Sequence, residues 1–311
     1  MASYFASGLY SLVHTDDLAS QIARFSVVVL PEMAVLSDAV CATLREFVAG
    51  GGGLVASGAV AKRDETGEWR GAFPLADVLG VEATNEEQGI LSGADTGWDA
   101  AQRHSYLQVV QSAHRLFEGL EDTDLLPFGG VLNGARATSA QVVATYLPSF
   151  PIFPPETAWF EAPRNPLPAL FASEFGSGRT VYLAADIERC FERDGLPDHA
   201  RLLENAVRFV AKTPIPLEVS GAGLLDCRLF RQESRLILHL VNQQNGAPAP
   251  LHELVAVGPF GIKVRRDLLP ASALSARFLV GGTNEDVRGS GDWWEFSVAT
   301  IHDHEVIVLD E

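Results

Sequence analysis

The stretch of residues 25–58 constrains the fold of this chain more than any other part of its sequence. It opens with the β-branched run 27–30, which has the length and composition of a strand buried on both faces of a sheet. An amphipathic segment follows, with Ser37 placed as its N-cap and four glycines at 50–53 ending it. A second apolar run occupies 54–56. This order predicts a strand, a helix and a parallel strand, the repeating unit of doubly wound α/β sheets.

The chain on either side of this unit supplies further elements of an α/β domain. A strand is expected at 9–13, and apolar residues on one face predict a helix at 199–212. The segments between them are interpreted as strands at 106–110 and 141–147, turns at 128–136, a polar excursion at 85–104 and a hairpin formed by 169–175 and 180–184.

A domain boundary is predicted at the sequence Thr213-Pro214-Ile215-Pro216. Beyond it the apolar pattern changes to short strands separated by turns, and no helix is expected. We therefore expect two domains, an α/β domain over 1–213 and a small antiparallel β-sandwich over 214–311.

The charge of the chain limits its partners. The net charge is −17, which argues against nucleic acid and anionic membranes, because both attract Lys and Arg patches. A neutral ligand such as a sugar is compatible with it, and so is acidity that only keeps the protein soluble. No apolar run approaches the ~18 residues of a membrane helix. We expect a cytoplasmic protein without a cofactor.

Six segments, in this order, resemble one known family. They are VVVLPEMAVLSDAVCATLREFVAGGGGLVASG, DETGEWR, LADVLGV, FGSGRTVYLAADIERCF, HARLLENAVRF and RLILHLVNQQ. Residues from about 9 to 212 look like the glutamine-amidotransferase-like trimerisation domain of glycoside hydrolase family 42 β-galactosidases and related hypothetical glycosyl hydrolases. The last segment looks like the β domain that follows it. The resemblance implies a flavodoxin-like sheet and a homo-oligomer, with a trimer as the first expectation.

The resemblance also implies what this chain lacks. Catalysis in that family belongs to an N-terminal (β/α)₈ barrel that carries two glutamates. No eightfold strand–helix repeat occurs here, so neither glutamate is carried over. The chain is similar to the family from the end of a first helix onward. Either it is the C-terminal portion of a longer polypeptide, or the sheet closes without its first strand by recruiting residues 9–13.

Amidotransferase chemistry needs a cysteine at a sharp strand-to-helix turn and a histidine to activate it. The G-x-C-x-G elbow is absent, and Cys41 falls inside the predicted helix, where a structural role is expected. Cys190 with His199 is the remaining pair of this kind, and we do not expect it to work as a nucleophile. The three cysteines (the third is Cys227) match no metal-binding spacing.

Polar residues follow three predicted parallel strands, where ligands of open α/β sheets bind. They are Glu32, the segment 62–65 with Asp64, and the group Asp186, Glu188 and Arg189. Asp186, Arg189, Glu32 and Asp64 are therefore the candidate catalytic residues. The alternative is a rim of loops whose charges pair with one another.

Two further groups of residues have a binding and a structural interpretation. The proline-rich arm 149–166 carries Phe153, Trp159 and Phe160, which either stack on sugar rings or pack against a neighbouring subunit. The run 302–305, His-Asp-His-Glu, has alternating metal-ligand types, but we predict no metal site there.

Three functions remain open on this sequence. The first is a non-catalytic structural and oligomerisation module of a glycoside-hydrolase-like protein. The second is a stand-alone hydrolase of a glycoside or an amide that uses the polar rim. The third is an accessory protein that binds carbohydrate through the aromatic arm.

Overall fold

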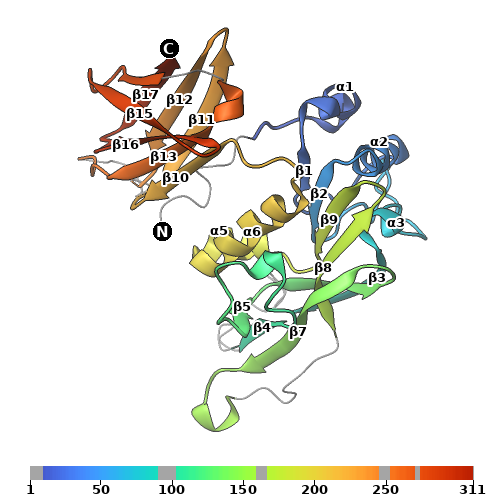
Figure 1. The fold of residues 1–311 in the computed structure, drawn as a ribbon. Helices are drawn as coiled ribbons and strands as arrows, with labels where there is room; N and C mark the ends of the chain where they lie inside the picture. The colour runs from blue at the N-terminus through green and yellow to red at the C-terminus, as the bar shows by residue number, and fades with distance from the viewer. Residues whose placement is uncertain (1–9, 90–102, 159–166, 245–252, 270–273, 311) are drawn as a thin grey trace. The chain divides into compact units, whose positions relative to one another are not determined.

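A computed structural model describes residues 10–89, 103–158, 167–244, 253–269 and 274–310 (Figure 1). The chain divides into two compact units. The first is Val13–Thr213, which we call the α/β unit. The second, the β unit, is Pro214–Glu311 together with the N-terminal residues up to Leu12.

The α/β unit is built on a mixed sheet of seven strands in the order β1-β2-β9-β8-β7-β4-β5. β1, β2 and β9 are parallel, and the remaining pairs are antiparallel. A separate antiparallel ribbon pairs β3 with β6. The strands are β1 (Val27–Leu30), β2 (Gly53–Ser57), β3 (Val81–Gly89), β4 (Arg103–Val109), β5 (Leu125–Pro127), β6 (Val131–Ala137), β7 (Gln141–Pro151), β8 (Pro168–Phe175) and β9 (Gly178–Leu183).

The predicted strand–helix–strand unit is confirmed. Helix α2 (Asp38–Ala49) joins β1 to β2, which pair in parallel register. The Ser37 hydroxyl caps the helix by accepting a hydrogen bond from the Val40 amide at 3.3 Å. Leu44 and Val48 on its inner face are fully buried. The local pattern of caps and apolar residues is therefore sufficient to specify this part of the fold.

Helices lie on both faces of the parallel strands. Figure 1 shows α2 and α3 on one side of β2 and β9, and α5 and α6 on the other. The predicted hairpin is confirmed as β8 and β9, closed where Phe175 pairs with Gly178. The helices are α1 (Leu18–Gln21), α3 (Ala76–Leu79), α5 (Ile187–Asp194) and α6 (Pro197–Val210), with 3₁₀ turns at Thr15–Asp17, Ile22–Arg24, Arg115–Phe117, Pro155–Thr157 and Arg266–Leu268.

Three expectations for the α/β unit are wrong. β1 is an edge strand rather than a strand buried on both faces, and its Val29 is 51% exposed. Residues 10–13 form no strand. The segments expected as turns and as an excursion contain β6, β3 and the start of β4. β3 and β6 pair over a long sequence separation, which the composition of either segment does not reveal.

Cys41 lies on the inner face of α2 and is buried. Burial raises the pKa of its thiol. We expect Cys41→Ser to lower the free energy of unfolding by about 1 kcal/mol or more, because the new hydroxyl needs a hydrogen-bond partner inside the core. The check is urea unfolding of both proteins together with thiol labelling of the native chain. Fast labelling of Cys41 before unfolding would contradict a structural role.

The β unit is all-antiparallel, as expected, and its strands form one nearly barrel-shaped sheet in the order β10-β13-β16-β15-β14-β17-β12-β11. Side chains alternate along its strands, so that Leu236, Leu238 and Leu240 of β12 point into the core. The strands are β10 (Leu217–Gly221), β11 (Leu225–Gln232), β12 (Arg235–Asn242), β13 (Phe260–Arg265), β14 (Leu274–Phe278), β15 (Asn284–Ser290), β16 (Trp293–Val298) and β17 (His304–Asp310).

Within the described ranges of both units, none of the helices has the length and apolar character needed to span a bilayer.

Candidate functional site

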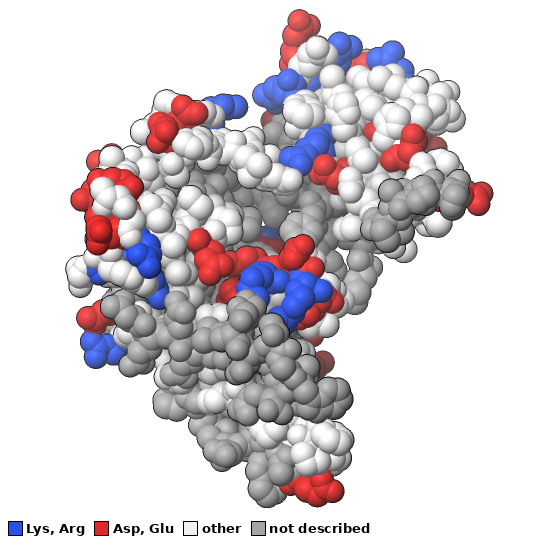
Figure 2. Space-filling model, turned by 180° about the vertical axis from the view of Figure 1, so that it is seen from behind, with Lys and Arg blue, Asp and Glu red and all other residues white. Residues whose placement is uncertain are grey.

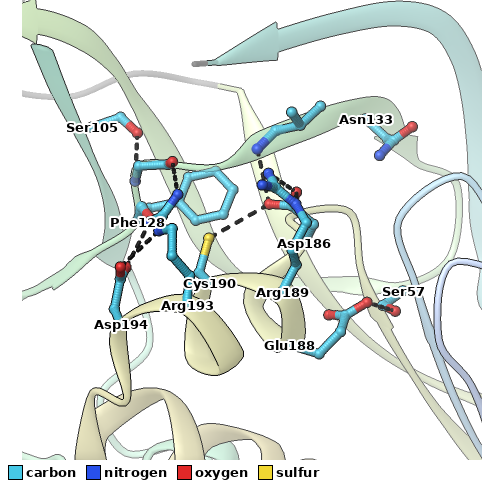
Figure 3. A network of polar contacts seen from close by, with 12 residues as sticks. Ser57, Ser105, Phe128, Asn133, Asp186, Glu188, Arg189, Cys190, Arg193 and Asp194 are labelled. Atoms are coloured by element: carbon cyan, nitrogen blue, oxygen red, sulfur yellow. Dashed lines mark hydrogen bonds and ion pairs between the residues drawn. The ribbon is translucent and has the colours of Figure 1, made fainter. Parts of the chain in front are cut away.

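The carboxyl ends of the three parallel strands bring polar side chains together. Glu32 follows β1, and Ser57 is the last residue of β2. Asp186 precedes α5 as its N-cap, and Glu188 and Arg189 lie in the first turn of that helix. Figure 3 shows Ser57, Asp186, Glu188 and Arg189 around the start of α5. We call these five residues the strand-end cluster.

Asp186 is the most deeply buried member, with 1% of its surface exposed. One carboxylate oxygen accepts a hydrogen bond from Arg189 Nε at 2.6 Å, and the other accepts from the Val131 amide at 2.8 Å. The Cys190 thiol donates to the second oxygen at 3.7 Å. The Asp186 amide in turn donates to the Val131 carbonyl at 3.2 Å. Asp186 therefore joins α5 to β6 and has its oxygens occupied by internal donors (Figure 3).

Glu188 occupies the centre of the cluster. The Ser57 hydroxyl donates to Glu188 Oε1 and accepts a hydrogen bond from the Glu32 amide at 3.2 Å. Glu188 Oε2 is buried, and no hydrogen-bond partner for it is found in the described part of the chain. Burial raises the pKa of Glu188, the hydrogen bond from Ser57 opposes this rise, and the charges of Asp186 and Glu32 add to it. The carboxyl group is thus held in a setting that disfavours its charge.

The raised pKa of Glu188 makes stability depend on pH. Between the ordinary value of 4.5 and the raised folded value, the folded chain binds the proton more tightly than the unfolded chain. The free energy of unfolding contributed by this group is therefore full below 4.5 and falls as pH rises through the folded pKa. We expect Glu188→Gln to flatten this slope, measured by urea unfolding from pH 4 upward. Glu174→Gln, at an exposed carboxylate of β8, is the control for the loss of an acidic side chain. A slope for Glu188→Gln no flatter than that of the control would contradict the assignment.

Asp64, the fourth candidate catalytic residue, makes its hydrogen bonds within the turn that follows β2. Its Oδ1 accepts hydrogen bonds from the amides of Thr66 and Glu68 and from the Thr66 hydroxyl, at 2.7–3.0 Å. The hydroxyl bond from Thr66 is the main reason that the pKa of Asp64 is lowered. Asp64 therefore shapes a turn. Lys62, two residues earlier, is buried and donates to Asn133 Oδ1 at 2.7 Å.

Cys190 and His199, the remaining candidate pair of nucleophile and base, make their hydrogen bonds to different partners: Cys190 to Asp186 and His199 to the Pro127 carbonyl. Burial raises the pKa of the Cys190 thiol to about 12, which disfavours the thiolate that a nucleophile requires. His199 Nε2 donates to the Pro127 carbonyl at 2.5 Å, and burial lowers the pKa of the ring. Its Nδ1 is buried without a hydrogen-bond partner in the described part of the chain. The ring fixes β5 against α6.

The aromatic arm is described only in part. Phe153 is exposed, whereas Trp159 and Phe160 lie outside the described residues. In the run 302–305, the buried Glu305 accepts hydrogen bonds from the amides of Val280 and Gly281 at 2.9 Å, which fixes the turn after β14. No group of three or more potential metal ligands is found within the described residues.

Several residues that build this region carry no sequence signal. Asn133 lies in a segment interpreted as turns, yet its amide donates to the Ala184 carbonyl at 2.8 Å and places β6 beside the end of β9. Gly130 must be glycine, because an added Cβ would lie 2.2 Å from Asp186 Oδ1. Ser57 is the exception, because its position at the end of an apolar run marks it as a strand end.

Comparison with known proteins identifies a family that matches most of the chain and several solved structures with a similar fold. The β-galactosidase trimerisation domain family matches residues 4–201. The structure is similar to the α-L-fucosidase isoenzyme 2 from Paenibacillus thiaminolyticus, with a TM-score of 0.67 and 16% identity over 99% of this chain and 44% of that one. It is also similar to a β-galactosidase from Bacillus circulans sp. alkalophilus, with a TM-score of 0.59 and 16% identity over 93% of this chain and 33% of that one.

A β-galactosidase from Rahnella sp. R3 gives a TM-score of 0.56 at 16% identity, over 98% of this chain and 35% of that one. At such identities the likeness is one of fold. The chain spans about a third of the length of these β-galactosidases. The comparison with curated proteins finds no match.

Proposed function

Because the chain belongs to the β-galactosidase trimerisation domain family, we propose that it is a non-catalytic assembly module that associates with copies of itself, as a trimer. The association would be the function of the α/β unit, which holds nearly all of the matched residues. In this proposal the substrates of the similar β-galactosidases and fucosidase are handled by parts of those enzymes that this chain does not match.

The observation that carries the proposal is the internal use of the acids at the strand ends. Asp186 is buried against Arg189 and the Val131 amide, and Asp64 is held by its own turn. The Cys190 thiol is protonated near neutral pH because its pKa is about 12. A catalytic acid or nucleophile must be able to contact the substrate. The hydrogen-bonding atoms of these groups are instead used within the protein, where they stabilise the fold.

The second candidate is a hydrolase that uses Glu188, and one observation favours it. A buried carboxyl group with a raised pKa and an unpaired oxygen is the form that a general acid takes. Against it, the carboxylate of Asp186 is occupied by Arg189 and the Val131 amide, so of the other acids in the cluster only Glu32 could serve as the second carboxylate.

An activity screen separates the two candidates. Purified chain is assayed with aryl-glycosides and with glutamine, beside Asp186→Asn and Glu188→Gln. The assembly proposal predicts no turnover by any of the three proteins. Turnover by the wild-type chain that either substitution abolishes, with the fold retained, would refute the non-catalytic assignment and support the hydrolase.

A further inference from the structure

Helix α6 is fixed to the rest of the α/β unit by polar contacts along its length. Near its start, the fully buried His199 donates from Nε2 to the Pro127 carbonyl of β5 at 2.5 Å. In its middle, the buried Asn205 donates to the carbonyls of Leu116 and Glu118 at 3.0 and 2.9 Å. Both carbonyls belong to the 3₁₀ turn that contains Leu116 and to its C-cap, which together we call the Leu116 turn. The helix is therefore held to β5 and to the Leu116 turn.

A second histidine shapes the Leu116 turn. His114 is the N-cap of this turn, and its Nδ1 accepts a hydrogen bond from the Leu116 amide at 3.2 Å. Its ring packs against the Phe209 ring near the end of α6, with the ring centres 5.0 Å apart. One histidine thus lies near the start of α6, and another contacts the helix near its end.

Both contacts need an uncharged imidazole ring. Nδ1 of His114 can accept from the Leu116 amide only while it carries no proton, because a protonated Nδ1 is itself a donor. Nδ1 of His199 is buried, and the described residues offer it no hydrogen-bond partner. A proton on this atom would be a donor without an acceptor and would place a charge in the core. Protonation of either ring therefore opposes the packing of α6.

The charged groups around His199 lie on α5 and on α6 itself. Burial is the main cause of the lowered pKa of His199, and the charge of Arg193 adds to it. The Pro127 carbonyl and the carboxylates of Asp194 and Asp198 act in the opposite direction. β5, whose sequence is Leu-Leu-Pro, brings no charged side chain to the ring. The folded chain thus favours the neutral form of His199.

The surroundings of His114 act in the same direction. Burial lowers the pKa of His114, and the charge of Arg115 adds to this effect, whereas Phe209 of α6 is uncharged. Because both pKa values are lowered, the folded chain binds fewer protons than the unfolded chain just below the ordinary value of 6.5. The stability that the two rings contribute is therefore full above pH 6.5 and falls as pH drops below it.

We propose that acidification releases α6 from β5 and from the Leu116 turn, because His199 and His114 hold the helix only while both are uncharged. The rest of the α/β unit stays folded during this release. α6 ends at Val210, and the chain enters the β unit at Pro214. Acid therefore loosens the element that leads directly into the β unit. This inference does not depend on the assembly proposed above.

Histidine is the residue type whose charge changes in the pH range of this release. Figure 2 shows acidic side chains interspersed with basic ones on one face of the molecule. Exposed carboxylates titrate at about pH 4, and Lys and Arg above about pH 10, so their charges change little between pH 7 and 5. The exception is Glu188 of α5, whose raised pKa makes its contribution to stability grow as pH falls. That effect is opposite in sign to the one proposed for α6.

The test is hydrogen exchange of the wild-type chain at pH 7 and pH 5, read by mass spectrometry and corrected for the intrinsic pH dependence of exchange. The opening equilibrium of α6 should rise by up to about 30-fold for each histidine, because pH 5 lies about 1.5 units below the ordinary pKa of the ring. Helix α2 is the internal reference, since its cap is the Ser37 hydroxyl, which does not titrate in this range. Its protection should change little.

Two substitutions keep the hydrogen bonds of the rings and remove their titration. In His199→Gln the side-chain amide donates in place of Nε2, and in His114→Asn the amide oxygen accepts in place of Nδ1. We expect α6 of the double variant to be equally protected at pH 7 and pH 5. His302→Gln, at an exposed histidine of the β unit, is the control and should keep the response of the wild type. All of these proteins retain Glu188, so its contribution is common to them.

Each outcome decides a different part of the inference. Loss of protection at pH 5 confined to α6 and the Leu116 turn supports the release. Equal protection of α6 at both pH values, or a loss that α2 shares, would overturn it. A response that persists in the double variant would overturn the assignment to the two histidines. If the double variant fails to fold, the comparison of α6 with α2 in the wild-type chain decides. None of these results tests self-assembly, so the proposed function stands or falls separately.

Discussion

Asp186→Ala is expected to lower the free energy of unfolding by roughly 3 kcal/mol, the low end of what removing one partner of a buried ion pair costs. The low end applies because Arg189 is about one-third exposed and can reach water when its partner is lost. The partly buried Val131 amide would lose its acceptor at the same time. Urea unfolding of the two proteins measures the difference.

Glu174→Ala is the matched control for Asp186→Ala. Glu174 faces Arg179 at 3.8 Å on the exposed surface of the same unit, and pairs of this kind contribute from zero to about 1 kcal/mol. If the two substitutions had equal effects, Asp186 would not be the residue that joins α5 to β6. A structural role would then no longer account for the burial and hydrogen bonds of Asp186 in the strand-end cluster.

Gly178→Ala is expected to destabilise the chain by about 3 kcal/mol, the upper part of the usual range for overpacking. Gly178 opens β9, and a Cβ there would lie 2.3 Å from the carbonyl oxygens of Gly52 and Val48. Both obstacles are backbone atoms, so the end of α2 and the approach to β2 would have to move together. Thermal and urea unfolding measure the loss.

Gly71→Ala is the control for Gly178→Ala. Nothing lies within 4 Å of a Cβ at Gly71, so the substitution should change the free energy of unfolding by no more than about 0.5 kcal/mol. A similar small effect at Gly178 would mean that β2, β9 and α2 are packed less closely than the structure describes.

The parts of the fold that could be predicted from sequence are those coded locally. The Ser37 cap, the apolar stripe of α2 and the glycines after it specify the first strand–helix–strand unit without reference to the rest of the chain. The β8–β9 hairpin is likewise marked by its own turn. β6 could not be predicted, because its pairing with β3 and its contact with the end of β9 depend on residues distant in sequence.

In the candidate site, too, some features are coded locally in the sequence and others depend on residues that are distant in it. Glu32 and Asp186 could be placed at strand ends because the strands themselves were recognisable. Whether each acid is free or occupied depends on its three-dimensional neighbours. The position of Asp64 after a strand groups it with them, but its Oδ1 accepts hydrogen bonds from the amides two and four residues later. The Val131 amide that donates to Asp186 belongs to β6, the strand that the sequence does not reveal.

The most direct test of the account is the mass of the wild-type chain in solution, measured by light scattering at micromolar concentration. The chain has a mass of 33.5 kDa, and assembly as a trimer gives a particle of three times that mass. Dilution is expected to return this particle to monomers in one concentration-dependent transition. A particle of 33.5 kDa at every concentration would contradict self-assembly as the function of this chain.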